Sequence, residues 1–338
     1  MARSFRWTKA VTDQWESSIF DRLPRPRIAL PLAVALLLVG CSSTAGTEKL
    51  TPASPVARTK STVQSSPSAS RSSTPAISQG LKPPTVPGLT WHPAGSVVAG
   101  VPVTYLATTA RGAVGLLWIN PLLASFRLVP GTKVPEGGPA VAADGKPSTW
   151  VPNLVAAFNG GFLLKDRVGG YYNDHRMVSP LTSNLAALVI TSDGKLSVGL
   201  WERDFQLTTK TVTVRQNLRL LVDHNKAATS AFDTPRTWGI ANGGLWTANR
   251  SALGERPDGS LVYAYGHETT AAKMAEVLVG VGVERAMVLD MNKSWPGGFV
   301  YLHTHAGIVG QRVHAQQYHS ASVYYARYTK DFVAVLRR

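Results

Sequence analysis

Residues 185–199 read LAALVITSDGKLSVG, and a similar pattern returns at residues 251–263 as SALGERPDGSLVY. In each stretch a strand-like run leads into an Asp-Gly pair, Asp193-Gly194 or Asp258-Gly259, and a second such run follows. Asp-Gly readily adopts the backbone conformation that a tight hairpin turn requires. Both stretches therefore predict antiparallel β-hairpins, and they decide the fold class.

Apolar and β-branched runs continue this pattern along the chain. We expect further strands at residues 97–103, 114–119, 211–215, 286–289, 299–303 and 322–328. The clearest helix covers 269–281, where Thr269 or Thr270 can cap its start and Gly282 can end it. Many strands with few helices predict the α+β class, as a single domain with a mixed, largely antiparallel sheet.

The composition narrows the possible protein classes. The chain has 338 residues, of which 44% are hydrophobic and 16% are charged, so it is not fully disordered and can bury a core. Its one cysteine, Cys41, excludes a disulfide framework and a cysteine-built metal site. The net charge of +15 suits an anionic polymer or a phosphate-bearing substrate. No nucleic-acid-binding signature is present, so a nucleic-acid partner is not expected.

The N-terminal segment has the pattern of an export signal. Residues 28–40 form an apolar run after three arginines, too short to span a bilayer comfortably. The run ends in Leu38-Val39-Gly40-Cys41, which resembles a bacterial lipobox. We therefore expect residues 1–40 to be a signal peptide, and Cys41 to carry a lipid that anchors the protein to the outer face of the cytoplasmic membrane, within the cell envelope. A plain secretory signal or a short anchor helix is the alternative.

Residues 41–90 differ in composition from the rest of the chain. They are rich in serine, threonine and proline, and such a segment buries too little apolar surface to fold. We expect a disordered tether at 41–90 and the folded domain at 91–338.

Candidate site residues occur where glycines and polar residues follow strand-like runs. The first cluster is Asn159-Gly160-Gly161-Phe162, and Asn173 follows Gly169-Gly170 downstream. Glycine pairs allow the backbone to approach a ligand closely, and an asparagine amide can both donate and accept hydrogen bonds. A glycine-rich turn without a ligand is the alternative.

Two further clusters contain arginine. At Arg215-Gln216-Asn217 we favour a strand end with solvated polar groups over a ligand role. At Arg250-Ser251 a guanidinium beside a hydroxyl suits forked hydrogen bonding to a phosphate, and a surface salt bridge is the alternative.

The last cluster follows the strand predicted at 286–289. Asp290 would lie at the end of that strand, where burial could raise its pKa toward acid–base use, and Asn292 lies two residues on. A turn-capping aspartate is the alternative. Among the histidines, His267 is a candidate for substrate binding. His303 and His305 have a spacing that can bind a metal, but no third ligand accompanies them, so neither a metal nor another cofactor is predicted.

Taken in order, these clusters resemble the phosphodiester glycosidase family over roughly residues 100–328. The matching motifs are Asn159–Phe162, Arg250–Gly254 with the Asp258-Gly259 turn, and the helix that runs into Leu289-Asp290. Many members have Leu-Asp-Gly-Gly-Gly-Ser-Ser at the last motif, whereas this chain has Leu289-Asp290-Met291-Asn292-Lys293-Ser294-Trp295, which looks like an actinobacterial branch.

Together with the lipobox-like segment, the resemblance implies an extracytoplasmic, lipid-anchored hydrolase of sugar-1-phosphodiester linkages in cell-envelope glycopolymers or glycoconjugates. It assigns catalysis to Asp290, Arg250 and Asn159, and because each follows or ends a strand-like run, we expect the three side chains to line one cleft. The residues expected to bind substrate are Gly160, Gly161, Asn173, Ser251, His267 and Asn292. The expected partners are that glycan or phosphate-linked sugar, and the membrane through Cys41. The alternative is an envelope lipoprotein of the same fold that binds glycan without turnover, and a purely structural lipoprotein is a third, weaker interpretation.

Overall fold

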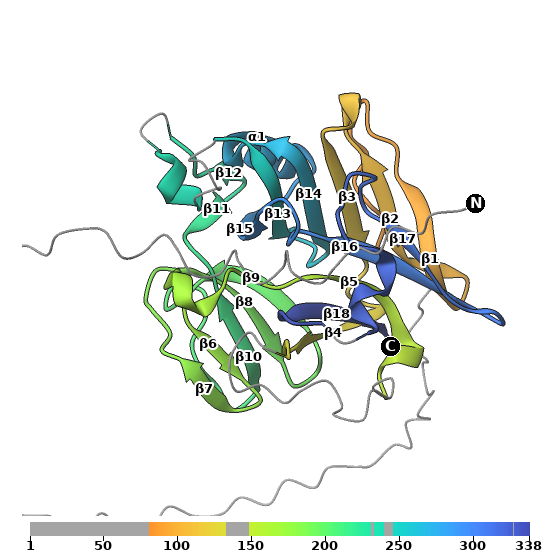
Figure 1. The fold of residues 1–338 in the computed structure, drawn as a ribbon, viewed down its shortest axis with the longest axis horizontal. Helices are drawn as coiled ribbons and strands as arrows, with labels where there is room; N and C mark the ends of the chain where they lie inside the picture. The colour runs from red at the N-terminus through yellow and green to blue at the C-terminus, as the bar shows by residue number, and fades with distance from the viewer. Residues whose placement is uncertain (1–80, 133–148, 231–232, 240–245, 327) are drawn as a thin grey trace, which may run out of the picture. The chain divides into compact units, whose positions relative to one another are not determined.

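The computed structural model describes residues 81–132, 149–230, 233–239, 246–326 and 328–338 (Figure 1). The predicted signal peptide, Cys41 and most of the predicted tether lie outside these ranges. Among the described residues, none of the helices has the length and apolar character needed to cross a membrane.

An eight-stranded sheet contains both strands of the hairpin predicted at residues 251–263. Its strand order is β1-β2-β3-β14-β13-β15-β11-β12, and each pairing is antiparallel. The strands are β1 (His92–Val98), β2 (Val101–Thr108), β3 (Val114–Ile119), β11 (Leu220–Asp223), β12 (Lys226–Ala227), β13 (Ala248–Glu255), β14 (Leu261–Thr269) and β15 (Arg285–Met291). The predicted 251–263 hairpin is the β13–β14 pair, so this prediction is confirmed.

Two five-stranded sheets complete the fold. One has the order β7-β6-β10-β8-β9, and the other has the order β17-β16-β5-β18-β4. The first contains β6 (Tyr171–Asn173), β7 (Arg176–Ser179), β8 (Ala186–Thr191), β9 (Leu196–Leu200) and β10 (Thr211–Gln216). The second contains β4 (Ala124–Val129), β5 (Leu154–Asn159), β16 (Gly298–Thr304), β17 (Gly307–Arg312) and β18 (Phe332–Arg337). The predicted 185–199 hairpin is the β8–β9 pair.

The α-helix α1 (Ala271–Gly280) covers one face of the eight-stranded sheet (Figure 1). Thr270 caps it, because its hydroxyl accepts a hydrogen bond from the Lys273 amide at 3.1 Å. We call this face of the eight-stranded sheet the helix face. Met274 and Leu278 point into the apolar cluster on it. Short 3-10 helices lie at Ala110–Gly112, Val151–Asn153, Leu164–Asp166, Pro235–Trp238 and Ala321–Tyr324.

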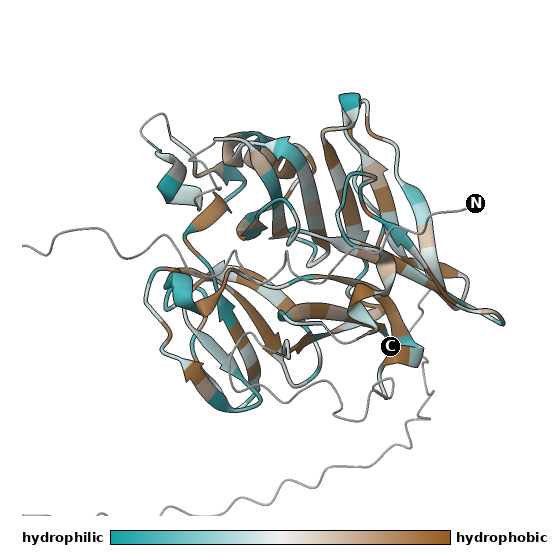
Figure 2. Ribbon diagram, viewed as in Figure 1, coloured by the Kyte–Doolittle hydropathy of each residue, from teal (hydrophilic) through white to brown (hydrophobic). Residues whose placement is uncertain are grey.

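The opposite face of the eight-stranded sheet, the inner face, meets both smaller sheets. One buried apolar cluster joins Leu253 of the large sheet to Leu188 and Val333 of the two smaller ones. In Figure 2 the strands carry most of the hydrophobic colour, and the turns that join them are mainly hydrophilic. The predicted α+β class with largely antiparallel pairing is confirmed, with three sheets around one core instead of one sheet.

Three sequence predictions need correction. Residues 97–103 do not form one strand, because Ala99 and Gly100 have positive φ and turn the chain between β1 and β2. Residues 322–328 do not form a strand either: a 3-10 helix covers Ala321–Tyr324, and the strand comes later, at β18. Residues 81–90, which we assigned to the tether, pack against the helix-face cluster through Leu81, Val86 and Leu89.

Candidate functional site

The side chains of Arg250 and Ser251, which are consecutive in β13, lie on opposite faces of the eight-stranded sheet. Side chains alternate along a strand, so Arg250 shares the helix face with Ala252, and Ser251 shares the inner face with Leu253. Arg250 and Asp290 can therefore line one cleft only if the Asp290 side chain, on β15, also lies on the helix face.

A register shift in β15 places Asp290 on the inner face. Ser251 lies opposite Asp290 and Ala252 lies opposite Val288, so one extra residue, Leu289, bulges between them. Uninterrupted alternation would have given Asp290 the face of Val288, which is also the face of Arg250. The prediction that Asn159, Arg250 and Asp290 line one cleft is thus wrong for Arg250.

Asp290 is 2% exposed and forms a buried ion pair. Its Oδ2 accepts a hydrogen bond from Lys330 Nζ at 2.5 Å, and its Oδ1 accepts one from the Met291 amide at 2.7 Å. Ser251 fixes the backbone, since its hydroxyl accepts a hydrogen bond from the Asp290 amide at 3.2 Å. Burial raises the pKa of the Asp290 carboxyl, and the Lys330 ammonium offsets part of that rise.

A second buried ion pair lies beside the first along the chain. Asp331 Oδ2 accepts a hydrogen bond from Arg215 Nε at 2.9 Å, and both side chains are at most 1% exposed. Arg215 also donates to the carbonyl oxygens of Phe162 and Gln216. Among the described residues Asp331 Oδ1 has no hydrogen-bond partner, so this carboxylate retains one unused acceptor.

The glycine pair of the first motif makes room for this ion pair. A Cβ on Gly160 would lie 2.5 Å from Asp331 Oδ2, and a Cβ on Gly161 would lie 3.1 Å from Arg215 Cζ. The Gly160 amide also donates to the Asp331 carbonyl oxygen at 2.9 Å. Both glycines are therefore required by close packing against buried charges, and they contact these charges rather than an open surface.

Two asparagines tie the strands of this region together. Asn159 Oδ1 accepts hydrogen bonds from the Tyr263 hydroxyl at 3.0 Å and from the Gly297 amide at 3.1 Å. Asn217 Nδ2 donates to the Val288 and Leu289 carbonyl oxygens, where β15 bulges. Arg215, Gln216 and Asn217 are all buried, so our interpretation of them as solvated groups is wrong. We call Asn159, Arg215, Ser251, Asp290, Lys330 and Asp331 the buried polar network.

On the helix face, Arg250 is 3% exposed and has no ion-pair partner among the described residues. Its guanidinium donates to the carbonyl oxygens of Thr269 at 3.1 Å, Trp238 at 2.8 Å and Trp246 at 3.3 Å. Burial lowers the pKa of Arg250 to about 10. A side chain whose nitrogens all bind backbone carbonyls holds segments together and has no free fork for a phosphate.

Other predicted binding residues are separate from the network. Asn173 is buried in β6, where its Oδ1 accepts a hydrogen bond from Thr213 at 2.6 Å. Asn292 forms a local turn, since its Oδ1 accepts from the Ser294 amide at 3.1 Å. Trp295 follows this turn and lies over Lys330, with the ammonium 4.6 Å from the ring centroid.

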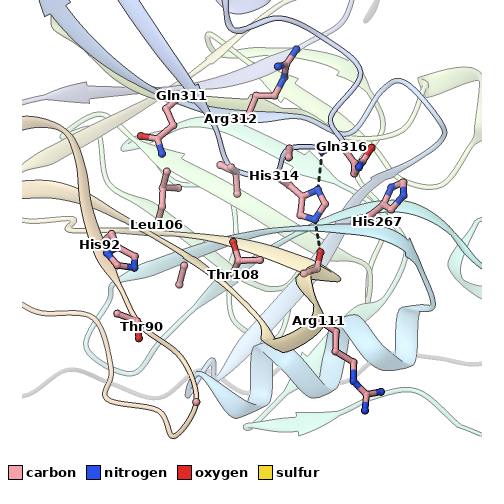
Figure 3. Close-up of a pocket in the computed structure, with 15 residues that line it drawn as sticks. Thr90, His92, Leu106, Thr108, Arg111, His267, Gln311, Arg312, His314 and Gln316 are labelled. Atoms are coloured by element: carbon pink, nitrogen blue, oxygen red, sulfur yellow. Dashed lines mark hydrogen bonds between the residues drawn. The ribbon is translucent and has the colours of Figure 1, made fainter.

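His267 is the one predicted site residue that lines the pocket shown in Figure 3. The pocket has a volume of about 800 Å³ and lies between β2, the turn at 111–112, β14 and residues 311–316. His314 forms its centre and stacks on Tyr265, with ring centroids 5.2 Å apart. Figure 3 shows His92 and His267 on opposite sides of His314.

The pocket is on the same face of the sheet as Asp290. Cross-strand pairing connects Asp290 to Ser251, Ser251 to Tyr265, and Tyr265 to Gly115. A Cβ on Gly115 would lie 3.1 Å from that of His314. Because neighbouring strands are about 4.8 Å apart, Tyr265 is about 10 Å from Asp290 across the sheet.

Sequence reasoning missed Lys330 and Asp331. Their only signal is a Lys-Asp pair directly before the apolar run of β18, and counterions for buried charges cannot be matched without the fold. His303 and His305 do not share a strand, because β16 ends at Thr304, and the His303 ring bonds to the Leu154 carbonyl oxygen at 2.8 Å. Among the described residues no group of three or more histidine, cysteine or acidic side chains is placed to hold a metal.

Comparison with known proteins finds a family model that matches part of the chain. Residues 152–290 match the family model described as phosphodiester glycosidase. This match confirms the resemblance inferred from the motifs, over a shorter span, and it includes Asn159, Arg250 and Asp290. The sequence has no match among curated proteins.

Matches among solved structures include two proteins. One is the catalytic domain of zebrafish N-acetylglucosamine-1-phosphodiester alpha-N-acetylglucosaminidase, at 16% identity and a TM-score of 0.44, covering 74% of this chain and 88% of that one. The other is a hypothetical protein from Synechocystis, at 13% identity and a TM-score of 0.37, covering 74% of this chain and 62% of that one.

Proposed function

We propose that residues 152–290, which match the phosphodiester glycosidase family model, belong to a hydrolase domain that cleaves sugar-1-phosphodiester linkages in a cell-envelope glycopolymer or glycoconjugate. The observation that carries this proposal is the family match across the segments that supply Asn159, Arg215 and Asp290 to one buried polar network.

The chemistry requires little from the protein. Water adds at the anomeric carbon, the bond from that carbon to the bridging oxygen breaks, and the phosphate leaves with the bridging oxygen. Phosphate is a good leaving group, so one carboxylate and local charge stabilisation suffice. In this proposal Asp290 provides acid–base chemistry or stabilises the developing oxocarbenium ion.

Positive charge for the phosphate comes from Lys330 in this proposal, in place of Arg250. Lys330 is paired with Asp290 at 2.5 Å, so both groups can serve one substrate, whereas Arg250 projects from the other face. Asp331 adds a second carboxylate with an unused oxygen, and its negative charge helps to raise the pKa of Asp290. Asn159 and Ser251 hold the surrounding strands in place.

The direct test is an assay of the purified full-length protein against a panel of sugar-1-phosphodiesters, measured as released reducing sugar. Asp290→Asn should lower turnover by about 10²- to 10⁴-fold. Asp290→Glu keeps a charge for Lys330 while displacing the carboxylate, so it separates lost catalysis from lost folding. Asp166→Asn removes an exposed carboxylate and is the matched control. Full activity in both Asp290 variants would contradict the assignment.

Glycan binding without turnover is the second candidate. It is favoured by the partners of Asp290, since both of its carboxylate oxygens are engaged, and by a pocket that lies away from it. Retention of the protein on isolated wall polymer, with no sugar released from any member of the panel, would establish this function and exclude the first.

The proposed location is the outer face of the cytoplasmic membrane, through a lipid on Cys41. Cys41→Ser should release the protein from the membrane fraction, and mass spectrometry of the unaltered protein should show the lipid. Unchanged fractionation together with an unlipidated cysteine would exclude the anchor.

A further inference from the structure

The pocket around His314 is built mainly from segments outside the family match. Of the residues that line it, His267 lies within residues 152–290, while the others come from 88–112 and 311–316. The glycosidase match therefore does not account for this pocket.

The centre of the pocket is an aromatic surface. His314 Nε2 bonds to the Gly112 carbonyl oxygen at 2.7 Å, and its Nδ1 accepts from the Gln316 amide at 3.1 Å, so both ring nitrogens are engaged. His267 stacks beside it, with centroids 5.9 Å apart. Its Nδ1 donates to Asn249 Oδ1 at 3.1 Å, which leaves Nε2 available to a ligand.

Hydroxyl and amide groups surround these rings. Thr108, Gln311 and Gln316 line the pocket and supply both donors and acceptors. Flat rings together with mixed donors and acceptors match a neutral sugar, which presents apolar C–H faces and hydroxyl groups. The stated volume of about 800 Å³ is large enough for such a unit.

The two ends of the pocket are positively charged. Figure 3 shows Arg111 and Arg312 at opposite ends of the group, with their guanidinium groups directed outward. Arg312 Nε donates to the His319 carbonyl oxygen at 3.1 Å, and neither arginine has an acidic partner among the described residues. No aspartate or glutamate occurs among the described lining residues, so the field at both ends favours anions.

We infer that this pocket binds one internal sugar unit of a phosphodiester-linked glycan, with Arg111 and Arg312 each contacting one of the two flanking phosphates. The inference rests on the proposed function in one respect only, namely that the bound polymer is a phosphodiester-linked glycan. A single sugar phosphate would engage one end of the pocket, whereas a polymer segment engages both ends. The site lies on the inner face, as Asp290 does, and is separate from it.

The test compares two probes on immobilised full-length protein by surface plasmon resonance with brief injections. One probe is a trimer of N-acetylglucosamine units joined by 1-phosphodiesters, and the other is the methyl diester of N-acetylglucosamine 1-phosphate. The trimer should bind at least about tenfold more tightly, and its affinity should fall as salt concentration rises.

Arg111→Gln and Arg312→Gln should each weaken trimer binding about tenfold, because each removes one charge-assisted contact. The matched control is Arg127→Gln, which removes an exposed arginine on β4 and should leave binding unchanged. Equal affinity for the two probes, or an equal loss in the Arg127 variant, would overturn the inference.

Hydrolysis of the methyl diester distinguishes this inference from the proposed function. The unaltered protein and the Arg127→Gln control should cleave it at the same rate, because Asp290 and Lys330 are unchanged in both. If no protein cleaves it while the trimer binds as expected, the proposed function fails and the pocket assignment stands.

Discussion

Two buried arginines on two different sheets, Arg215 on β10 and Arg250 on β13, show two ways of holding a cation away from water. Arg215 lies in a five-stranded sheet and pairs with the Asp331 carboxylate. Arg250 is on the helix face, where three backbone carbonyl oxygens take the place of a carboxylate. The sequence favoured a solvated strand end for Arg215 and a phosphate contact for Arg250, but both side chains are buried and bind groups within the protein. The difference is that the Arg215 side also gathers Asp290 and Lys330, the groups that suit catalysis.

The largest expected effect tests whether buried Arg215 needs the carboxylate of Asp331. Asp331→Asn should lower the free energy of unfolding by about 3–5 kcal/mol, because Arg215 would keep a buried charge without its counterion. Urea unfolding measures this change. Asp166→Asn, on an exposed turn, should stay within about 0.5 kcal/mol of the unaltered protein. An equally small loss for Asp331→Asn would show that backbone acceptors alone suffice for both arginines.

The next effect tests the close approach at the first motif. Gly160→Ala should cost about 1–3 kcal/mol, because its Cβ would lie 2.5 Å from Asp331 Oδ2, which Arg215 holds in place. Gly280→Ala is the matched control, since a Cβ there meets nothing within 4 Å. Thermal unfolding of the two variants should therefore differ clearly. Equal stabilities would mean that Asp331 can move without loss.

Arg250 should respond more mildly. Arg250→Lys keeps the charge but cannot reach the Thr269, Trp238 and Trp246 carbonyl oxygens together, so we expect a loss of about 1–2 kcal/mol in unfolding free energy. Because Arg250 has no phosphate role in this proposal, the KM for a sugar phosphodiester should stay unchanged in the folded variant. A large rise in KM at full stability would return Arg250 to the substrate site.

The smallest effect concerns the pH dependence of the inner face. Burial raises the pKa of Asp290 in the folded protein above its unfolded value of about 3.9. The folded state then binds more protons than the unfolded state between the two pKa values, so the stability contribution present at low pH is lost as pH rises through that window. The unfolding free energy relative to Asp290→Asn should fall by up to about 1.4 kcal/mol per pH unit there. A constant difference from pH 4 to 7 would contradict the raised pKa.

Local patterns in the sequence predicted the hairpins and the helix well. The Asp193-Gly194 and Asp258-Gly259 turns and the Thr270 cap depend on residues close together in the chain, and each is found as expected. The strand at 97–103 failed because positive φ at Ala99 leaves no clear mark in an apolar run.

The site was harder to predict because it depends on register and on distant partners. Asp290 and Asn159 were identified, but the bulge at Leu289 that turns Asp290 away from Arg250 cannot be read from alternating hydrophobicity. Lys330 and Asp331 were missed, since nothing near them in the sequence indicates which buried charges they neutralise. The glycines were identified correctly as positions of close approach, although they approach Asp331 and Arg215, not a ligand.

The neighbouring positions of Lys330 and Asp331 also set an order of events during synthesis. The ribosome makes Arg215 and Asp290 well before it makes their counterions, which arrive together directly ahead of β18. Until β18 inserts between β5 and β4, the nascent chain carries a cation and a carboxylate that cannot be buried without their partners. Completion of the core is therefore delayed until residues 330–337 have been made, and a chain that stalls before them exposes unfinished strand edges to chaperones and proteases.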